Sequence, residues 1–348
     1  EVMSLRHRFG LEGLVGGLCA VVINTAPEDF LPAAGELLGG TALRFEAVVE
    51  DPLSGPGGSC LLLRDGFGGD FLLKTRQGGD NPFASYNLGA KTGPDSAARL
   101  ETFVFACNDL ERYVAIQKTR GVRFLTDVPI ENAAFSCIQT EPSPYTGNSL
   151  GFIEWKGRPG AYVAVANPGC GCVPVKPDRP WLSRIGGLDH VATRVRARQR
   201  DAAIVEFLGL TGYHFEFAVY VESLNSITSV ARLGAGDYAQ VFTSGIVPGD
   251  VSQDAGPTER FIDNYGVRPH HMAFSAVGIE DVVSGLAADG WQFLCKLAGS
   301  REEGLKQIFS AMSSRTLLVN EYIERYDGFD GFFTKSNVTH LTKATEKQ

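Results

Sequence analysis

The sequence predicts an α+β protein made of two homologous domains in tandem. The chain has 348 residues, which is longer than most single domains, so two domains of roughly 150 residues are expected. A second observation is an internal repeat, because a shift of 169 residues aligns 102–125 with 271–294 without a gap. Both segments show an apolar strand, then a helix, then a second strand led by glycine.

Six positions of this alignment are identical. They are Phe105/Phe274, Glu111/Glu280, Val114/Val283, Gly121/Gly290, Phe124/Phe293 and Leu125/Leu294. A shift of 170 places 16–21 on 186–191, and a shift of 167 places 151–155 on 318–322. Generic strand and helix patterning is the alternative explanation. Three matches in the same order, at nearly one offset, favour a duplication.

The repeat also predicts the domain boundaries. We expect a first domain at 10–160, a linker at 161–183, a second domain at 184–335 and a polar tail at 336–348. The linker is rich in glycine and proline, as expected where few contacts cross between domains. Its Cys170-Gly171-Cys172 cluster has no matching second pair, so we interpret it as a loop thiol pair rather than a zinc site.

Composition argues against several classes of protein. Seven scattered cysteines fit a reduced cytoplasmic protein better than a disulfide framework. The sequence contains no apolar run of about 18 residues, so we expect no membrane-spanning helix. The net charge is −8, and Lys and Arg are scattered apart from 194–200, so we expect no nucleic-acid partner.

Comparison of the two copies identifies a candidate metal site in the second copy. The pairs that we compare are His190/Ala20, His271/Thr102 and Glu321/Glu154. Two histidines and one carboxylate with open coordination positions are typical of non-haem Fe(II) oxygenases, although Mn and Zn accept the same ligands. The sequence therefore predicts a mononuclear metal site at His190, His271 and Glu321, with Fe(II) as the favoured ion.

The alternation of side chains along a strand supports these ligands. His190 shares its face with Ala192, and His271 shares its face with Ala273 and Ser275. Small neighbours leave room for a metal and a substrate. The commoner role of a buried histidine is a hydrogen-bonded core residue, but three ligand types in the corresponding strands favour a metal.

Two neighbouring residues compete with the chosen ligands. His270 is adjacent to His271, and adjacent strand residues face opposite sides, so we expect only one of them to point inward. The face with small residues favours His271. The same rule separates Glu321 from Glu324, which are three residues apart.

Short motifs of the second half resemble 4-hydroxyphenylpyruvate dioxygenase, a two-domain member of the vicinal oxygen chelate superfamily. The matching segments are 188–191, 271–273, 306–309, 320–325 and 328–333. The resemblance implies that each domain is a half-open β-barrel of paired βαβββ units, and that a C-terminal helix closes the active site. It also implies that the N-terminal domain has lost its metal ligands.

The resemblance further implies that His190, His271 and Glu321 hold Fe(II), and that Gln307 has a catalytic role. Gln307 and Phe309 are two residues apart on a predicted strand, so they face the same way. The substrate contacts that it suggests are Ser226, Ser244, Thr258, Gln307, Phe309, Phe329, Phe332 and Phe333. Of these, Ser244 and Thr258 replace polar residues of the family, and the segment between His271 and Glu321 is shorter than in typical members.

The activity implied by the resemblance is oxidative decarboxylation of a 2-oxo acid, an aryl- or alkylpyruvate, coupled to oxygenation of the same molecule by O2. Three alternatives remain open. They are side-chain hydroxylation of the hydroxymandelate-synthase type, another metal-dependent activity of the superfamily such as ring cleavage or isomerase or lyase chemistry, and a non-catalytic binding protein. A homo-oligomer formed through the N-terminal domain is a further expectation at the family level.

Overall fold

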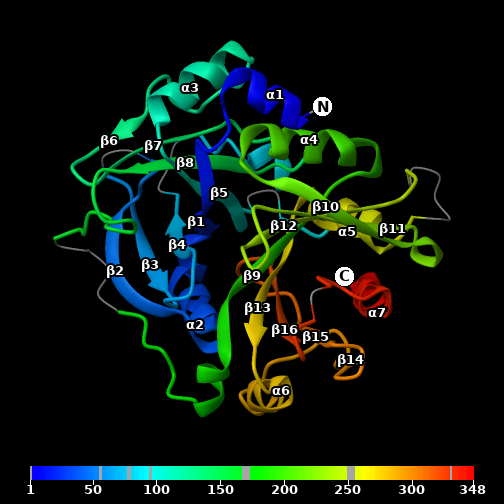
Figure 1. Cartoon of the computed structure of the whole chain (residues 1–348). Helices are drawn as coiled ribbons and strands as arrows, with labels where there is room; N and C mark the ends of the chain where they lie inside the picture. The colour runs from blue at the N-terminus through cyan, green and yellow to red at the C-terminus, as the bar shows by residue number, and fades with distance from the viewer. Residues whose placement is uncertain are drawn as a thin grey trace.

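The computed structural model describes residues 2–54, 57–76, 80–93, 96–166, 173–248, 255–329 and 331–348. These residues form two eight-stranded sheets with helices packed against them (Figure 1). The cysteine cluster at 170–172 lies outside the described residues.

The first sheet is built from two βαβββ units, preceded by helix α1 (Val2–Phe9). The first unit contains β1 (Val15–Thr25), α2 (Phe30–Gly40), β2 (Arg44–Glu50), β3 (Ser59–Arg64) and β4 (Asp70–Thr75). The second contains β5 (Arg99–Cys107), α3 (Leu110–Thr119), β6 (Ile130–Glu131), β7 (Phe135–Gln139) and β8 (Ser149–Trp155). The strand order β2-β3-β4-β1-β5-β8-β7-β6 joins the two units through the antiparallel pair β1 and β5.

The second sheet repeats this arrangement. Its first unit contains β9 (Ile185–Arg194), α4 (Arg200–Leu210), β10 (His214–Val221), β11 (Ser226–Arg232) and β12 (Ala239–Ser244). Helix α5 (Pro257–Tyr265) leads to the second unit, which contains β13 (Arg268–Ala276), α6 (Ile279–Ala288), β14 (Ala298–Ser300), β15 (Leu305–Phe309) and β16 (Val319–Arg325). The strand order β10-β11-β12-β9-β13-β16-β15-β14 matches the first sheet and confirms two tandem copies of one α+β fold.

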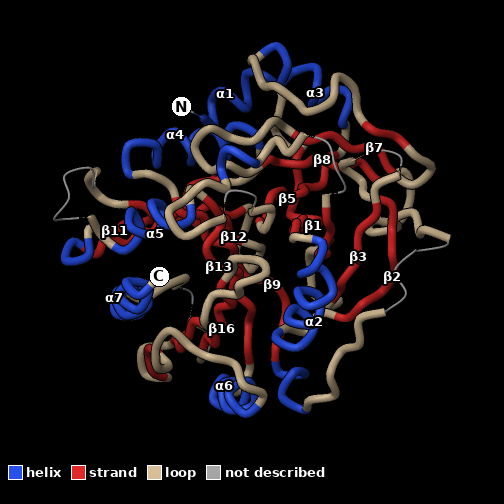
Figure 2. The backbone as a smooth tube through the Cα atoms, turned by 180° about the vertical axis from the view of Figure 1, so that it is seen from behind, coloured by secondary structure: helices blue, strands red, loops and turns tan. Residues whose placement is uncertain are grey.

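The two sheets share one apolar core. Phe71 of β4 and Phe274 of β13 stack with ring centroids 6.1 Å apart, and Phe105 of β5 meets Phe207 of α4 at 5.9 Å. Burying one such side chain contributes about 1.5–3 kcal/mol. The central strands β1, β5, β9 and β13, which contribute to this core, lie in the middle of the molecule in both views (Figure 1 and Figure 2).

The segment expected to be a polar tail, 336–348, forms most of helix α7 (Lys335–Ala344) and a short turn after it. The side chain of Thr334 caps the helix by accepting a hydrogen bond from the backbone N–H of Asn337. Val338 and Leu341 are three residues apart, so they share one face, and both are buried. A polar average composition concealed this apolar face.

The strand register corrects the last of the three repeat matches. Ala273 of β13 pairs with Glu321 of β16, and its counterpart Val104 of β5 pairs with Gly151 of β8. Glu321 therefore corresponds to Gly151, at a shift of 170, and the pairing of Glu321 with Glu154 is wrong.

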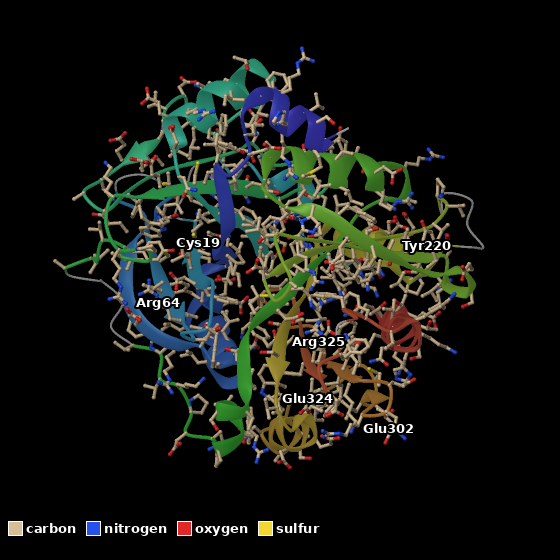
Figure 3. All side chains as sticks on the ribbon, in the orientation of Figure 1. Cys19, Arg64, Tyr220, Glu302, Glu324 and Arg325 are labelled. Atoms are coloured by element: carbon tan, nitrogen blue, oxygen red, sulfur yellow. The ribbon has the colours of Figure 1, made fainter. Side chains whose placement is uncertain are left out.

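Glu154 instead corresponds to Glu324, at the end of β16 over α6 (Figure 3). Glu154 accepts a hydrogen bond from the backbone N–H of Leu110 at 2.8 Å, and Glu324 accepts one from Ile279 at 2.8 Å. Each carboxylate thus satisfies a free N–H at the start of a helix. The shift of 167 aligned a metal ligand with a helix-capping residue.

The inner face of the first sheet contains buried ion pairs. Nζ of Lys74 lies 2.8 Å from Asp51 and 3.2 Å from Glu101. Arg76 adds a contact of 2.7 Å to Glu101. All the carboxylates and ammonium groups of this cluster have partners, so the first copy closes its interior with charges of opposite sign.

We predict that Lys74→Ala lowers the free energy of unfolding by about 3–5 kcal/mol, because Asp51 loses its buried counter-ion and Glu101 loses one of two. Urea denaturation monitored by circular dichroism measures this change. The control is Lys156→Ala, which removes a partly exposed pair with Glu131 and should cost about 0–1 kcal/mol. Equal costs for the two variants would contradict the prediction.

Candidate metal centre

His190, His271 and Glu321 converge on the inner face of the second sheet. They lie on β9, β13 and β16, which are neighbours in the strand order. The Nε2 atom of each histidine is 3.2 Å from Oε2 of Glu321, and one ligand atom of each residue lies within 4.8 Å of the others. All three side chains are buried.

Strand register explains why these side chains meet. Ala273 pairs with His190 on one side and with Glu321 on the other, so the three residues form one row across three strands. His271 precedes Ala273 by two residues and therefore faces the same way. The small methyl group of Ala273 lies in the middle of this row, between His190 and Glu321. It therefore leaves free space on the inner face of the sheet.

The residues present fit a divalent metal ion. Nε2 of His190 is buried and forms no hydrogen bond in the described part of the chain, although it lies 3.2 Å from Oε2 of Glu321. Such an orphaned nitrogen is costly unless it binds something. Metal–ligand bonds of about 2.1 Å at right angles would place neighbouring ligand atoms about 3 Å apart. The two observed separations of 3.2 Å agree with that spacing.

A bulge in β9 places Asp189 beside His190. The register between β9 and β13 skips Asp189, which is therefore an extra residue whose side chain is re-aimed. Its Oδ1 is 2.7 Å from Nδ1 of His190, and its Oδ2 accepts a hydrogen bond of 2.5 Å from Arg325. Asp189 thus fixes the ring of His190 with Nε2 toward the other two ligands. Figure 3 places Arg325 beside Glu324 on β16.

These contacts determine the protonation of the histidines. Burial disfavours a charged imidazole, but Glu321 and Asp189 outweigh burial and raise the pKa of His190 to about 9. Burial raises the pKa of Asp189, yet the hydrogen bond from His190 and the charge of Arg325 lower it below its usual range. Burial lowers the pKa of His271 well below its usual value, so this ring is neutral at pH 7.

The expectation that only one of His270 and His271 faces inward is wrong. A second bulge makes His270 an extra residue of β13, and both rings line the same cavity. Nδ1 of His270 lies 2.8 Å from Nδ1 of His271, and its Nε2 lies 2.7 Å from Oε1 of Gln348. His271 therefore has one ring nitrogen held by His270 and the other directed to Glu321.

Gln307 connects Glu321 to helix α7. Its amide nitrogen donates to Oε1 of Glu321, and its amide oxygen accepts a hydrogen bond of 3.1 Å from Asn337. Both ends of the amide are therefore occupied. The orientation of the carboxylate depends in this way on the position of α7.

A small cavity of about 40 Å³ is lined by two of the three ligands, His271 and Glu321. Five of the predicted substrate residues line it, namely Ser226, Thr258, Gln307, Phe309 and Phe333. Val338 and Leu341 of α7 cover it. The space holds about three water molecules, so an organic molecule would fit only after a movement of α7 or of the aromatic side chains.

Three other predicted substrate residues do not line this cavity. The hydroxyl of Ser244 donates to the carbonyl oxygen of Gly245 at 2.8 Å. Phe332 packs on the ring of His190, with centroids 5.3 Å apart. Phe329 packs with Phe333 against the small apolar cluster around Ala273.

Several residues that line the cavity are not among the predicted site residues. They include Arg194, Thr228 and His270. Arg194 follows His190 by four residues on one strand and shares its face, so alternation could have identified it. His270 had no such signal, because a bulge of one residue leaves no clear mark in the sequence.

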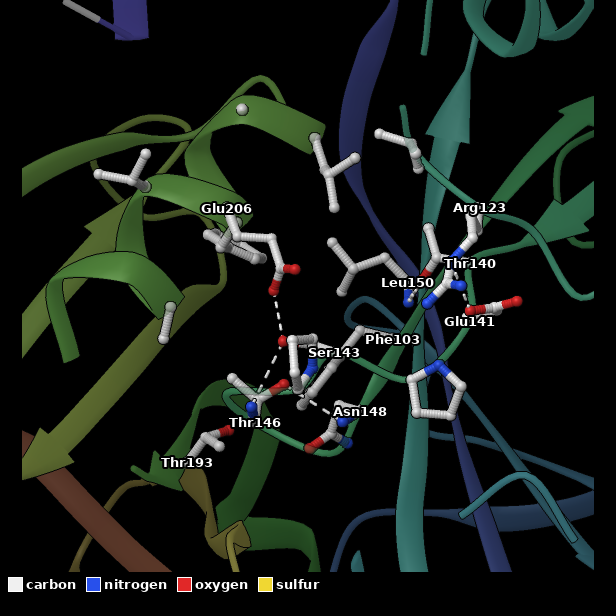
Figure 4. A pocket seen from close by; sticks show the side chains of 18 of the residues that line it. Phe103, Arg123, Thr140, Glu141, Ser143, Thr146, Asn148, Leu150, Thr193 and Glu206 are labelled. Atoms are coloured by element: carbon white, nitrogen blue, oxygen red, sulfur yellow. Dashed lines mark hydrogen bonds and ion pairs between the residues drawn. The ribbon is translucent and has the colours of Figure 1, made fainter. Parts of the chain in front are cut away.

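A larger cavity of about 350 Å³ lies between the two copies (Figure 4). Phe103 of β5 and Thr193 of β9 line it, together with Glu206 of α4. Burial raises the pKa of Glu206, which accepts a hydrogen bond from Ser143. Among the described residues, the one group able to hold a metal is His190, His271 and Glu321, so this second cavity lacks comparable chemistry.

Comparison with known proteins adds evidence on the fold. No protein-family model and no curated protein matches the sequence. A solved variant of 4-hydroxymandelate synthase from Streptomyces coelicolor superimposes with a TM-score of 0.68 at 17% identity, covering 96% of this chain and 99% of that one. The chain has the fold of 4-hydroxyphenylpyruvate dioxygenase-like proteins.

A second solved structure agrees. It is a fusion of a xylose isomerase-like TIM barrel with 4-hydroxyphenylpyruvate dioxygenase, with a TM-score of 0.63 at 14% identity. The match covers 96% of this chain and 52% of the fusion. Both similarities confirm two tandem vicinal oxygen chelate domains as the fold. No helix among the described residues is long and apolar enough to cross a membrane.

The first copy suggests a test of the metal site. Its Val104 occupies the position of Ala273 in the second copy. Ala273→Val should therefore place two methyl groups in the free space between the metal ligands. We predict a loss of affinity for Fe(II) or Co(II) of at least about 100-fold, at a packing cost of about 1–3 kcal/mol. Anaerobic metal titration measures it. Val104→Ala is the matched control, and unchanged affinity in Ala273→Val would refute the prediction.

The raised pKa of His190 determines how metal binding depends on pH. Below about pH 9 the metal must displace a proton from His190, so affinity should rise by up to about tenfold per pH unit and then level off. The same proton stabilises the metal-free fold fully below about pH 6.5, and this contribution disappears as the pH rises through about 9. Calorimetry in buffers of different ionisation enthalpy should show release of about one proton at pH 7. Zero release would contradict this assignment.

Proposed function

We propose that the protein is an Fe(II)-dependent dioxygenase that oxidatively decarboxylates a 2-oxo acid and oxygenates the same molecule. The observation that carries this proposal is the group of His190, His271 and Glu321 beside a closable cavity. Two histidines and one carboxylate leave coordination positions open, as in non-haem Fe(II) oxygenases. The shared fold with 4-hydroxymandelate synthase and the dioxygenase fusion supports the proposal.

Fe(II) bound by these ligands would supply the activation of O2 and the binding of the two oxygens of a 2-oxo acid. The protein's own residues prepare the site. Asp189 holds the ring of His190, and Gln307 holds the carboxylate of Glu321. Such supporting contacts fix the ligands before the substrate arrives.

The cavity walls orient the substrate and exclude water. Phe309 lies against His271 with centroids 4.7 Å apart, and Phe333 lies against His190 at 5.2 Å. Hydroxyl groups of Ser226 and Thr258 line the same space. Leu341 of α7 closes it from the outside, which keeps reactive species away from bulk water.

The test is made on anaerobically purified protein. We expect one Fe(II) per chain, a visible charge-transfer band after addition of a 2-oxo acid, and O2 uptake matched by release of CO2. His190→Ala should abolish all three signals, whereas His214→Ala, which alters an exposed residue of β10, should change none. The oxygenated product distinguishes ring from side-chain hydroxylation.

Two results would overturn the proposal. Fe(II) binding without O2 uptake across aryl- and alkylpyruvates would point to another metal-dependent activity of this fold. Absence of metal binding, with equal stability of the native protein and His190→Ala, would point to a non-catalytic binding protein.

A further inference from the structure

Arg194 is a buried cation at the end of strand β9. Its side chain is only 4% exposed and lines the same cavity as His271 and Glu321. It follows His190 by four residues, which is about 13 Å along an extended strand. Arg194 therefore lies on the metal-binding face, and His270 stands between its guanidinium and the ligand His271.

No carboxylate in the described part of the chain forms an ion pair with Arg194. Nη1 donates to the carbonyl oxygen of Pro257 at 3.2 Å, and Nη2 lies 3.3 Å from Nε2 of His270. Its guanidinium also lies over the ring of Phe261, 4.4 Å from the centroid. Burial is the cause of a lowered pKa for Arg194, with no acidic neighbour to oppose it.

Lys74, another buried cation, contacts both Asp51 and Glu101. Arg6, Arg99 and Arg268 are buried without an ion pair among the described residues, and they donate to backbone carbonyl or amide oxygens. Arg194 differs from these three in position, because it alone among them lines the cavity beside His271 and Glu321. A buried charge without a counter-ion is costly, and an anion that enters this cavity can supply one. At the position of Arg194 the first copy has Asn24, whose amide donates to a backbone carbonyl.

The formal charges around the cavity do not cancel. A divalent metal with Glu321 and Arg194 carries a net charge of about +2 when the neutral histidines are left out. A 2-oxo acid bound to the metal through its carboxylate neutralises one of these charges. One positive charge remains, and it belongs to Arg194.

We propose that Arg194 binds a second anionic group at the end of the substrate remote from the metal, so that the substrate is a 2-oxo acid with a further acid group. A carboxylate fits best, because the planar guanidinium pairs with it through two parallel hydrogen bonds. The hydroxyls of Ser226, Thr228 and Thr258 line the same cavity and can donate to such a group. This inference rests on the proposed function and specifies its substrate class.

The test compares matched pairs of ligands. Straight-chain 2-oxo diacids of increasing length, and phenylpyruvate with and without a ring carboxylate, are titrated into the anaerobic Fe(II) protein while the charge-transfer band is followed. We expect the diacid to bind about 10- to 100-fold more tightly than the matched monoacid at the best length.

Arg194→Met should reduce this ratio to about one. Arg194→Lys keeps the charge and should retain part of the preference. A preference that survives in Arg194→Met would overturn the inference, as would equal binding of monoacid and diacid by the native protein.

Stability separates this role from a structural one. Removal of an unpaired buried charge should leave the melting temperature of Arg194→Met unchanged or higher, whereas loss of a structural contact would lower it. A large decrease in melting temperature together with an unchanged ligand preference assigns Arg194 to the fold and refutes the inference.

A further arm distinguishes failure of this inference from failure of the proposed function. If no 2-oxo acid gives a charge-transfer band, the proposed function fails. Binding of a simple diacid such as glutarate to the same protein is then measured by calorimetry. If glutarate binds the native protein but not Arg194→Met, Arg194 still forms an anion site. If glutarate does not bind the native protein, the inference about Arg194 fails as well.

Discussion

The arrangement of the metal centre depends on two bulges in the antiparallel pair β9 and β13. In a regular strand, neighbouring side chains face opposite sides, so a ligand and the residue next to it could not cooperate. The bulges place Asp189 beside His190 and His270 beside His271. Each ligand therefore has its supporting partner next to it in the chain.

The first copy has bulges at the same places. The register between β1 and β5 skips Cys19 and Glu101, which correspond to Asp189 and His270. Cys19 lines a cavity with Trp155, and Trp155 occupies the position of Arg325. The backbone irregularity is thus common to both copies, although the side chains differ.

The two copies fill the equivalent buried space with different polar side chains. Glu101 forms ion pairs with Lys74 and Arg76 in the first copy, whereas the second copy gathers histidines and one glutamate. At Gly151 of the first copy, an added Cβ would lie 3.1 Å from Val104, so any side chain there requires Val104 to shift.

The duplication and the α+β class were predictable because they follow from periodicities of two residues along strands and about 170 residues along the chain. The half-open barrel was implied only by the resemblance of short motifs. A prediction from periodicity fails where a single residue alters the period. His270 was placed on the wrong face, and Glu321 was matched to Glu154, since neither a bulge nor a strand register is visible in one sequence. The apolar face of α7 was hidden by its polar neighbours.

The hydrogen bonds from Glu321 through Gln307 to Asn337 link helix α7 to the metal site. Any outward movement of α7 separates Asn337 from Gln307 and frees the amide to rotate. The carboxylate then loses a fixed donor and can change how many of its oxygens it offers. The position of helix α7 and the orientation of the Glu321 carboxylate are therefore coupled through a single amide side chain.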